Sequence, residues 1–363
     1  MDDNKALNLD KGKKIHFLNK DPENFLRKST LIFGATSTGK TTLCEEILYL
    51  CKDIIPTIFV ICPTNSSSNA YTGKVPSRCI KDDLDMVWLE KLLARQKHLS
   101  EVCKLTESID ILLPIFKKVA DPKTIMITQS IYQRGEDSLS IVDQSENLNY
   151  AKKKTQRITI QQDRCNILKK IYKSTIKLHK KKLLESIDLE DFQRTVVEMI
   201  DVYPDIMLIF DDCASKFKKW YKERPDLFKA LFFEGRWKNI SLIILSQDDK
   251  EIDSEIRKNA RVTIFTTQQA ASATFERGAN HFSKFEKDLS REIIKKVFYQ
   301  PPNEPKHYQK LCYLQNELDP FRYTIADLYE DFKFGCPQIW ELNKKIGDNN
   351  SINKENPFFI KYG

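Results

Sequence analysis

The sequence has 363 residues, of which 41% are hydrophobic and 30% charged, so it predicts a globular chain of one large domain or two. No stretch approaches the roughly 18 apolar residues of a transmembrane helix, and the polar N-terminal residues lack the apolar segment of a signal peptide. Nine cysteines without a CxxC pair or zinc-type spacing predict reduced thiols, and the net charge of +8 weakly favours a polyanionic partner.

The first part of the chain predicts the start of an α/β fold. We expect residues 1–28 to form an N-terminal arm or a loose first strand. Residues 29–33 are apolar and predict a short strand, and residues 41–52 predict a helix. The β-branched, apolar run 57–62 predicts a strand that is buried on both faces, as in a parallel sheet.

The middle of the chain is polar and predominantly helical in pattern. Residues 82–120 have leucines at helical spacing, whereas residues 121–150 are polar and are expected to be partly disordered. Residues 152–182 hold twelve Lys or Arg residues and one acid, Asp163, with apolar residues threaded through them at helical spacing. We therefore predict a helical, basic insertion over about 75–200.

The α/β pattern returns after residue 205. Strands are predicted at 206–210, 241–245 and 262–265, with helices between them. The segments 296–299 and 310–314 resemble a C-terminal hairpin at the edge of the sheet.

The whole pattern predicts a P-loop NTPase fold with a mostly parallel central sheet flanked by helices. We assign residues 29–340 to this domain and residues 341–363 to a polar tail.

A phosphate-binding loop follows the first predicted strand. The loop matches GxxxxGK[ST], and in this pattern backbone N–H groups and a helix N-terminus face the phosphates of ATP. Its residues are Gly34, Ala35, Thr36, Ser37, Thr38, Gly39, Lys40 and Thr41. We expect Lys40 to reach the β- and γ-phosphates, Thr41 to bind Mg²⁺, and Thr42 to lie near the α-phosphate. A chance match occurs in about one protein in a hundred, but here a strand precedes the loop and a helix follows it.

Polar residues end two of the later strands. Asp211 and Asp212 follow the strand 206–210, and we assign Asp211 to the metal and Asp212 to the attacking water. The alternative is a pair of turn acids that cap the next helix. Gln247 follows the strand 241–245 and is predicted to touch the γ-phosphate or the water, with an ordinary loop glutamine as the alternative.

Two sets of basic residues are candidates for further contacts. An arginine that stabilises the transferred phosphate often comes from a neighbouring subunit, and the candidates are Arg236, Arg257, Arg261 and Arg277. The basic stretch is predicted to grip DNA phosphates without reading sequence, with a solvated helix face as the alternative. Its candidate contacts are Lys152, Lys153, Lys154, Lys169, Lys170 and Lys173.

Four blocks of the sequence resemble the HerA–FtsK superfamily of P-loop ATPases. The blocks are LIFGATSTGKTTL (31–43), IMLIFDDC (206–213), FFEGRWKNISLIILSQD (232–248) and IDSEIRKNARVTIF (252–265). Within the superfamily the chain is similar to the genome-packaging ATPases of nucleocytoplasmic large DNA viruses, the poxvirus-type packaging ATPases. The resemblance covers roughly residues 29–70 and 200–330 and leaves the region from about 75 to 200 unmatched.

The resemblance implies an additional-strand ATPase core, RecA-like in type, in a homo-oligomeric ring that moves double-stranded DNA into a preformed capsid. It implies a capsid or portal partner, and a location in the host cytoplasm, in the virus factory, or in the virion. By position it assigns Lys40 and Thr41 to the phosphate loop, Asp211 and Asp212 to the second acidic motif, and Gln247 to a sensor. Arg236, in a Gly-Arg pair, is the resulting candidate for the catalytic arginine.

Other functions remain open at this stage. They are another DNA-dependent ATPase such as a helicase or DNA pump, a nucleotide or small-molecule kinase, and a virion or scaffold protein with a relict nucleotide site. The combination of Asp211, Asp212 and Gln247 favours hydrolysis over a kinase reaction. The intact Lys40 and Thr41 argue against a relict site.

Overall fold

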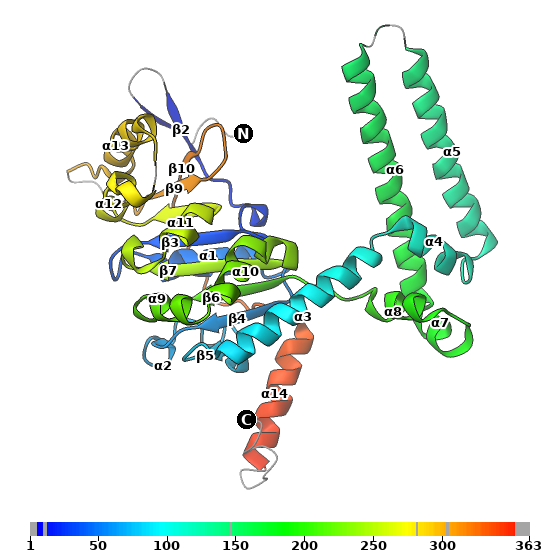
Figure 1. Cartoon of the computed structure of the whole chain (residues 1–363), viewed down its shortest axis with the longest axis horizontal. Coiled ribbons are helices and arrows are strands. Elements are labelled where there is room, and N and C mark those ends of the chain that lie inside the picture. Colours follow the sequence, from blue (N-terminus) through cyan, green and yellow to red (C-terminus); the bar gives the residue numbers. More distant parts are fainter. Residues whose placement is uncertain are drawn as a thin grey trace. The chain divides into compact units, whose positions relative to one another are not determined.

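The computed structural model describes residues 6–9, 13–145, 147, 149–280, 282–302 and 305–352, without the side chains of 214, 215 and 347–352. The chain forms two compact units (Figure 1). One comprises Met1–Lys97 and Asp205–Gly363 and contains the sheet. The other, His98–Pro204, is helical. None of the described helices combines the length and apolarity needed to cross a bilayer.

The first unit is built on a sheet whose described strands run in the order β1-β2-β10-β9-β8-β3-β7-β6-β4-β5. The six strands from β8 to β5 are mutually parallel, whereas β9 is antiparallel to both of its neighbours. The strands are β1 (Ala6–Asn8), β2 (Lys14–Phe17), β3 (Ser29–Phe33), β4 (Thr57–Ile61), β5 (Ile80–Lys81), β6 (Ile206–Phe210), β7 (Ile240–Ser246), β8 (Val262–Phe265), β9 (Lys310–Leu314) and β10 (Phe321–Thr324).

The position of β7 defines the type of fold. It lies between β3, which carries the phosphate loop, and β6, which carries the acidic pair, as predicted for an additional-strand ATPase. In register, Phe33 at the end of β3 pairs with both Ser246 of β7 and Phe265 of β8. The loops that follow these strands therefore leave the sheet at one edge, which is where parallel α/β sheets place their ligands.

Helices cover both faces of this sheet, which is why all residues of β6 and β7 are buried. One face packs against α1 (Lys40–Cys51), with Leu43 and Ile47 set against Ile32 and Ile243. The other packs mainly against α9 (Ala214–Glu223), α10 (Pro225–Glu234), α11 (Ser254–Asn259), α12 (Gln268–Glu276) and α13 (Lys284–Phe298). The short helix α2 (Asn65–Ser68) and the C-terminal α14 (Pro337–Ile352) complete the unit.

The helical unit is dominated by a long pair, α5 (Pro122–Gln144) and α6 (Tyr150–Leu178), which run antiparallel side by side (Figure 1). Its buried core lies where α6 meets α4 (Ile109–Lys117) and α8 (Asp191–Met199), and includes Phe116, Tyr172 and Val196. The unit also contains α7 (Lys180–Ser186), and α3 (Met86–Leu105) crosses its boundary with the first unit.

Two expectations about local structure are wrong. Residues 122–144 are not disordered but form α5, because Asp121 caps the helix by accepting from the Thr124 N–H and Pro122 occupies its first turn. Residues 296–298 are not a strand but end α13, which a capping box of Ser283 and Glu286 starts.

The ends of the sheet also differ from expectation. β9 forms its hairpin with β10, and β2 and β1 continue the sheet beyond β10, so the hairpin does not lie at the edge. Part of the predicted N-terminal arm thus joins the sheet. Residues 341–352 of the predicted polar tail belong to α14. The predicted arm at 1–5 and 10–12 and the tail at 353–363 lie outside the described residues.

Candidate functional site

The phosphate loop joins the buried strand β3 to α1. Gly39 is the N-cap residue of α1, with φ +84°, and no described side chain caps the helix. Ser37 also has a positive φ, of +60°. The first N–H groups of α1 are therefore free to bind an anion, and the partial positive charge of the helix N-terminus favours one.

Gly34 is required by a close approach of two strand ends. A Cβ atom on Gly34 would lie 1.8 Å from Oγ1 of Thr266, which follows β8. The Thr266 N–H donates to the Phe33 carbonyl at 2.8 Å, and the Thr266 and Thr38 hydroxyl oxygens lie 2.5 Å apart. Thr266, at the end of β8, thus packs against the phosphate loop and holds it through Phe33 and Thr38.

Lys40 is folded against its own loop. Its Nζ donates to the carbonyl oxygens of Gly34 at 2.7 Å and Ala35 at 2.9 Å. Burial lowers the pKa of Lys40, and the charges of Asp211 and Asp212 offset this only in part. A phosphate at the loop would take the place of the two carbonyls as acceptor.

A cavity of about 640 Å³ lies over the loop, a size typical of small-molecule sites. Thr36 to Thr42 line one side of it, and Asp211, Asp212 and Gln247 also line it. The structure therefore brings together the predicted residues from three strand ends. Gly34 and Ala35 contribute through the carbonyls that hold Lys40. The remaining lining residues are Thr64, Ser68, Ala70, Tyr308, Lys310, Ile325, Ala326 and Leu328.

The two aspartates differ in environment. Asp211 is buried, and Tyr71, itself fully buried, donates its hydroxyl hydrogen to Asp211 Oδ2 at 2.8 Å. Burial raises the pKa of Asp211, although the hydrogen bond from Tyr71 lowers it in part. Asp212 is exposed, has φ +57°, and accepts a hydrogen bond from Thr64 at 3.0 Å.

The acidic pair does not have the alternative role of capping. The next helix, α9, has Cys213 as its N-cap residue and no side-chain cap within the described chain. The left-handed backbone of Asp212 costs about 1–3 kcal/mol for a non-glycine residue, and such strain concentrates at functional sites. The strand order, the loop and the acidic pair together decide the fold family.

The chain has the fold of a P-loop ATPase.

Comparison with known proteins agrees with the viral part of the resemblance. No family model matches the sequence. Protein B354L of African swine fever virus, a large DNA virus, is 27% identical to this chain. The alignment is 373 residues long and covers 98% of this chain and 99% of that protein. Protein 075L of Invertebrate iridescent virus 6 is 34% identical over 71 residues, or 20% of this chain and 28% of that protein. The expected relation to proteins of large DNA viruses is thereby confirmed.

Solved structures give weaker matches. The genome packaging NTPase B204 from Sulfolobus turreted icosahedral virus 2, in complex with AMP, covers 86% of this chain and 100% of its own at 14% identity and a TM-score of 0.38. The pCW3 conjugation coupling protein TcpA covers 95% of this chain and 70% of its own at 13% identity and a TM-score of 0.37. At these values the fold assignment rests on the strand order and loop geometry given above.

Two of the four candidate arginines are tied to their own chain. Arg277 forms a bidentate pair with the buried Asp249, at 2.9 and 2.7 Å. Arg257 donates to the Ile252 carbonyl at 2.7 Å and to Asn280 at 2.8 Å. Both arginines hold the segment around α11 in place. These contacts argue against the prediction that Arg257 or Arg277 reaches the nucleotide site of a neighbouring subunit.

Arg236 and Arg261 lie at the amino ends of the parallel strands, whereas the phosphate loop lies at their carboxyl ends. Arg236 is exposed in the turn before β7, and its guanidinium lies 4.5 Å from the ring centroid of Trp237. The seven residues of β7 separate it from Gln247, a span of roughly 20 Å. Arg236 therefore cannot serve the site of its own P-loop ATPase domain.

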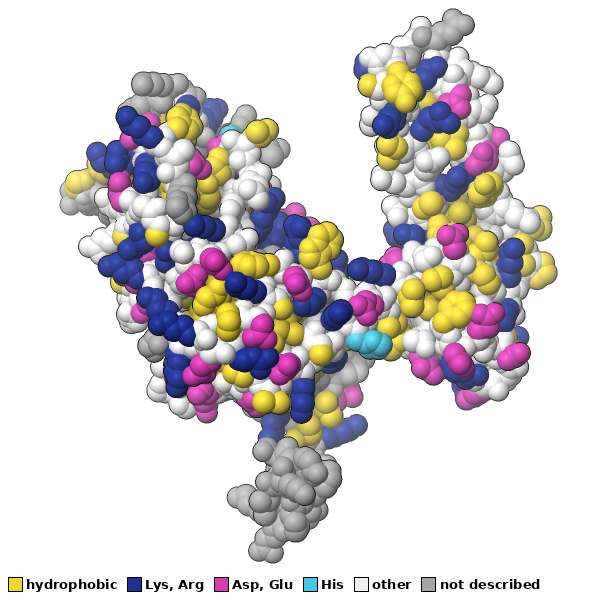
Figure 2. All heavy atoms as spheres, viewed as in Figure 1, with side chains coloured by type: hydrophobic (Ala, Val, Ile, Leu, Met, Phe, Trp, Pro, Cys, Tyr) yellow, Lys and Arg dark blue, Asp and Glu magenta, His cyan; other side chains and the backbone are white. Residues whose placement is uncertain are grey.

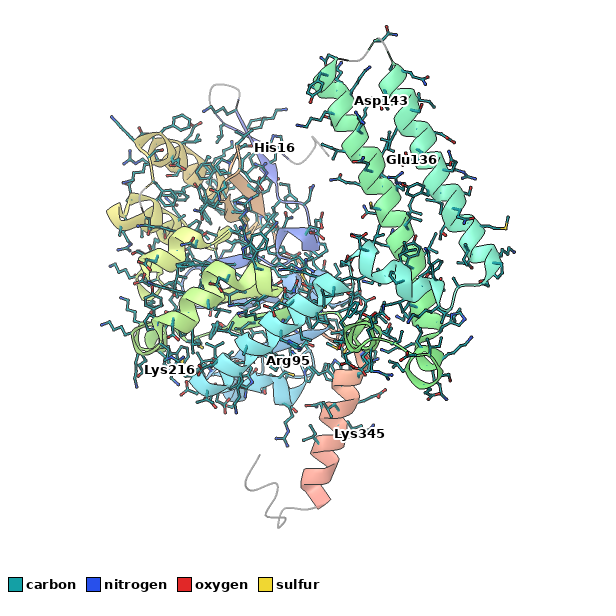
Figure 3. All side chains as sticks on the ribbon, turned by 45° about the vertical axis from the view of Figure 1, so that its right-hand side comes forward. His16, Arg95, Glu136, Asp143, Lys216 and Lys345 are labelled. Carbon is teal, nitrogen blue, oxygen red and sulfur yellow. The ribbon has the colours of Figure 1, made fainter. Side chains whose placement is uncertain are left out.

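The basic residues of the second unit fall into two groups. Some pair within the unit: Lys173 pairs with Glu107 at 2.5 Å, Arg157 with Asp143, and Arg164 with Glu136. Figure 3 labels the two carboxylates on α5, Asp143 and Glu136. Lys153 donates to the carbonyl of Asp143, and Lys169 is half-buried. The exposed Lys152, Lys154 and Lys170 form no ion pair with any described residue. Figure 2 shows Lys and Arg side chains along this helical pair.

Sequence reasoning missed Thr64, Tyr71, Thr266 and Lys310 as site residues. Thr266 follows β8 directly, so the strand-end rule that found Gln247 would have found it, whereas Thr64 lies three residues after the end of β4, within the loop that leaves the same end of the sheet. Tyr71 and Lys310 carry no such signal, because Tyr71 lies in a loop and Lys310 begins a strand outside the parallel core.

Proposed function

We propose that this protein is an ATP-hydrolysing motor that translocates double-stranded DNA into a preformed viral capsid. The observation that carries the proposal is the cavity in which the loop Thr36–Thr42 meets Asp211, Asp212 and Gln247 at one edge of an additional-strand sheet. This arrangement supplies a phosphate cradle, a cation and two carboxylates in one place, as nucleotide hydrolysis requires.

The residues of the site have separable roles. Lys40 and the N–H groups of α1 bind the phosphates of ATP. The oxygen donors of Thr41 and Asp211 line the same cavity and suit Mg²⁺, which would neutralise charge on the phosphates when bound. Asp212, held by Thr64 and exposed to solvent, accepts a proton from the attacking water, and Gln247 orients that water.

A ring explains the position of Arg236. Its exposure at the edge opposite its own cavity, next to the exposed aromatic rings of Phe233 and Trp237, suits a contact with a second copy of the chain. In a head-to-tail arrangement such a contact repeats around the ring, and each Arg236 stabilises the transferred phosphate of the next subunit.

The DNA and capsid parts rest on the family resemblance and on the whole-length similarity to a protein of a large DNA virus. The exposed lysines of α6 support DNA contact, because a solvated helix face normally mixes both signs of charge. With this function go a capsid or portal partner and a location in the virus factory of the host cytoplasm or in the virion.

The test is ATP hydrolysis by the assembled protein with and without long duplex DNA. A motor is stimulated by duplex DNA, a kinase ignores DNA and phosphorylates an acceptor, and a relict site does not turn over. Absence of stimulation in an assembled ring contradicts the proposal.

The contribution of Arg236 is tested by mixing inactive subunits. Arg236→Ala subunits keep the phosphate loop, and Lys40→Ala subunits keep Arg236, so mixed rings should regain hydrolysis that neither variant shows alone. The same mixing experiment with Arg261→Ala in place of Arg236→Ala is the comparison. The arginine that acts across the interface is the one whose variant is inactive alone and regains hydrolysis when it is mixed with Lys40→Ala. If mixing restores nothing while mixed rings form, Arg236 does not act across the interface.

A further inference from the structure

Lys310 is a buried lysine at the nucleotide cavity. It begins β9, is 4% exposed, and lines the cavity with the phosphate loop. Its Nζ lies 3.4 Å, and its Cε 3.6 Å, from where a Cβ on Gly39 would stand. The ammonium group is therefore packed against the loop directly before Lys40.

The charge of Lys310 has no carboxylate partner among the described residues. Its Nζ donates one hydrogen bond, to the Tyr308 carbonyl at 3.2 Å, which leaves two donors. The carboxylate that acts most strongly on it, Glu46, already accepts from Lys20 at 2.5 Å and from the Asp327 N–H at 3.1 Å. Buried charges are ordinarily paired, so an anion in the cavity would satisfy this one.

Neighbouring charges indicate where along a nucleotide Lys310 lies. Lys40 is influenced by Asp211 and Asp212, whereas the carboxylate that most influences Lys310 is Glu46, in the second turn of α1. The acidic pair marks the γ-phosphate end of the site. Ile325, Ala326 and Leu328 line the same cavity and form an apolar wall that suits a base, and Asp327, which lies between Ala326 and Leu328, donates its N–H to Glu46 at 3.1 Å. Lys310 thus lies between the base end and the γ-phosphate end.

We propose that Lys310 is a second phosphate-binding cation of this site, which contacts the α- and β-phosphates of the bound nucleotide from β9. The proposal rests on the proposed function only in so far as the cavity binds nucleotide. It makes the hairpin β9–β10 part of the nucleotide site, although the hairpin lies outside the parallel part of the sheet.

The test is equilibrium binding of fluorescent ADP and ATP to the full chain and to Lys310→Met. The substitution should weaken both nucleotides by the same factor, about tenfold to a hundredfold, because a hydrogen bond to a charged group is lost. Without nucleotide, the thermal midpoint should stay or rise, because an apolar side chain of similar volume replaces an unpaired buried charge. A residue needed only for folding would instead lower that midpoint.

Two further variants complete the experiment. Lys28→Met removes a half-buried lysine away from the cavity. Lys28 lies at the amino end of β3 and donates to the Glu23 carbonyl at 2.6 Å, and its loss should leave nucleotide binding unchanged. Lys310→Gln keeps a donor for the Tyr308 carbonyl without the charge, and should bind as weakly as Lys310→Met. It also serves as the measurement if Lys310→Met does not fold.

The outcomes separate the two proposals. Wild-type affinity in either Lys310 variant, or a loss confined to ATP, overturns the role of Lys310 at the α- and β-phosphates and leaves the motor proposal standing. Nucleotide binding that depends on Lys310, without stimulation of hydrolysis by DNA, keeps Lys310 and rejects the motor. If the wild-type protein binds neither ADP nor ATP, both proposals fail.

Discussion

The charged side chains that matter for the proposed function are buried in one of the two compact units and exposed in the other. In the unit that contains the sheet, Asp211, Asp249 and Lys310 are buried and held by hydrogen bonds. In the helical unit, Lys152 and Lys170 are exposed on α6. Buried charges interact strongly with their neighbours, whereas exposed charges are screened by water and salt. Replacing one of these buried charges should therefore have a large effect, whereas only summed substitutions of the exposed lysines on α6 should have an effect.

The largest effect is expected at Lys40. Lys40→Ala should reduce ATP hydrolysis by about a thousandfold, because the loop loses the cation that stabilises the phosphates in the transition state. Steady-state hydrolysis measures this. Lys52→Ala, at the other end of α1, is the matched control and should retain activity. Substantial hydrolysis by Lys40→Ala would show that the activity arises elsewhere.

Asp249 should have the next largest effect, on stability rather than catalysis. Burial alone would raise its pKa, but hydrogen bonds from Arg277 and its neighbours outweigh burial, so the pKa lies below its usual value. Asp249→Asn leaves Arg277 with only the more distant and more exposed carboxylate of Asp248, at 3.6 Å, and should lower the free energy of unfolding by about 3 kcal/mol at neutral pH. Urea denaturation measures the difference.

The pH dependence of that loss follows from the direction of the shift. A carboxyl group with a lowered pKa in the folded state stabilises the protein above its unfolded pKa, and this stability is lost as pH falls through the folded pKa. The difference between the wild type and Asp249→Asn should therefore shrink below about pH 4. Asp226→Asn breaks an exposed pair with Arg224 and should change stability little. An equal loss in both variants would contradict the importance of burial.

A smaller effect is expected at Tyr71. Tyr71→Phe removes the hydrogen bond to Asp211 and should reduce hydrolysis by about tenfold. Because that bond lowers the pKa of Asp211, its loss should move the acidic limb of the pH–rate profile to higher pH. Tyr221→Phe loses a hydrogen bond to Glu255, outside the residues that line the cavity, and is the control. An unchanged profile would show that Tyr71 does not position Asp211.

The smallest effect per residue is expected on α6. At about 100° per residue, Lys152 and Lys170 lie at the same angle, opposite the buried Leu168 and Tyr172. Replacing both with Glu should weaken DNA binding and reduce the salt slope by about two units, while basal hydrolysis stays intact. The matched control replaces the exposed Lys218 and Lys222 of α9, which lie outside the basic stretch 152–182. If both double variants lose DNA affinity equally, the loss reflects the net charge of the protein and not a contact made by α6.

The sequence by itself determined the parallel core and half of the site. The loop from Gly34 to Thr41 is a local pattern, and Asp211 and Gln247 stand at the ends of short apolar runs that predict buried strands. Since parallel strands end at one edge of a sheet, their neighbourhood could be predicted without coordinates. The same local reasoning failed for α5, whose half-polar sequence is stabilised by packing along α6.

Only the tertiary structure decided which distant residues complete the site. Tyr71 reaches Asp211 across 140 positions, and Thr266 reaches Thr38 across 228. Lys310 lies next to Gly39 because β9 pairs with β8. Arg257 and Arg277 form their hydrogen bonds within their own chain. Such contacts depend on which strands become neighbours and on which charges lose access to water. Both follow from the packing of the whole sheet and have no counterpart in local sequence.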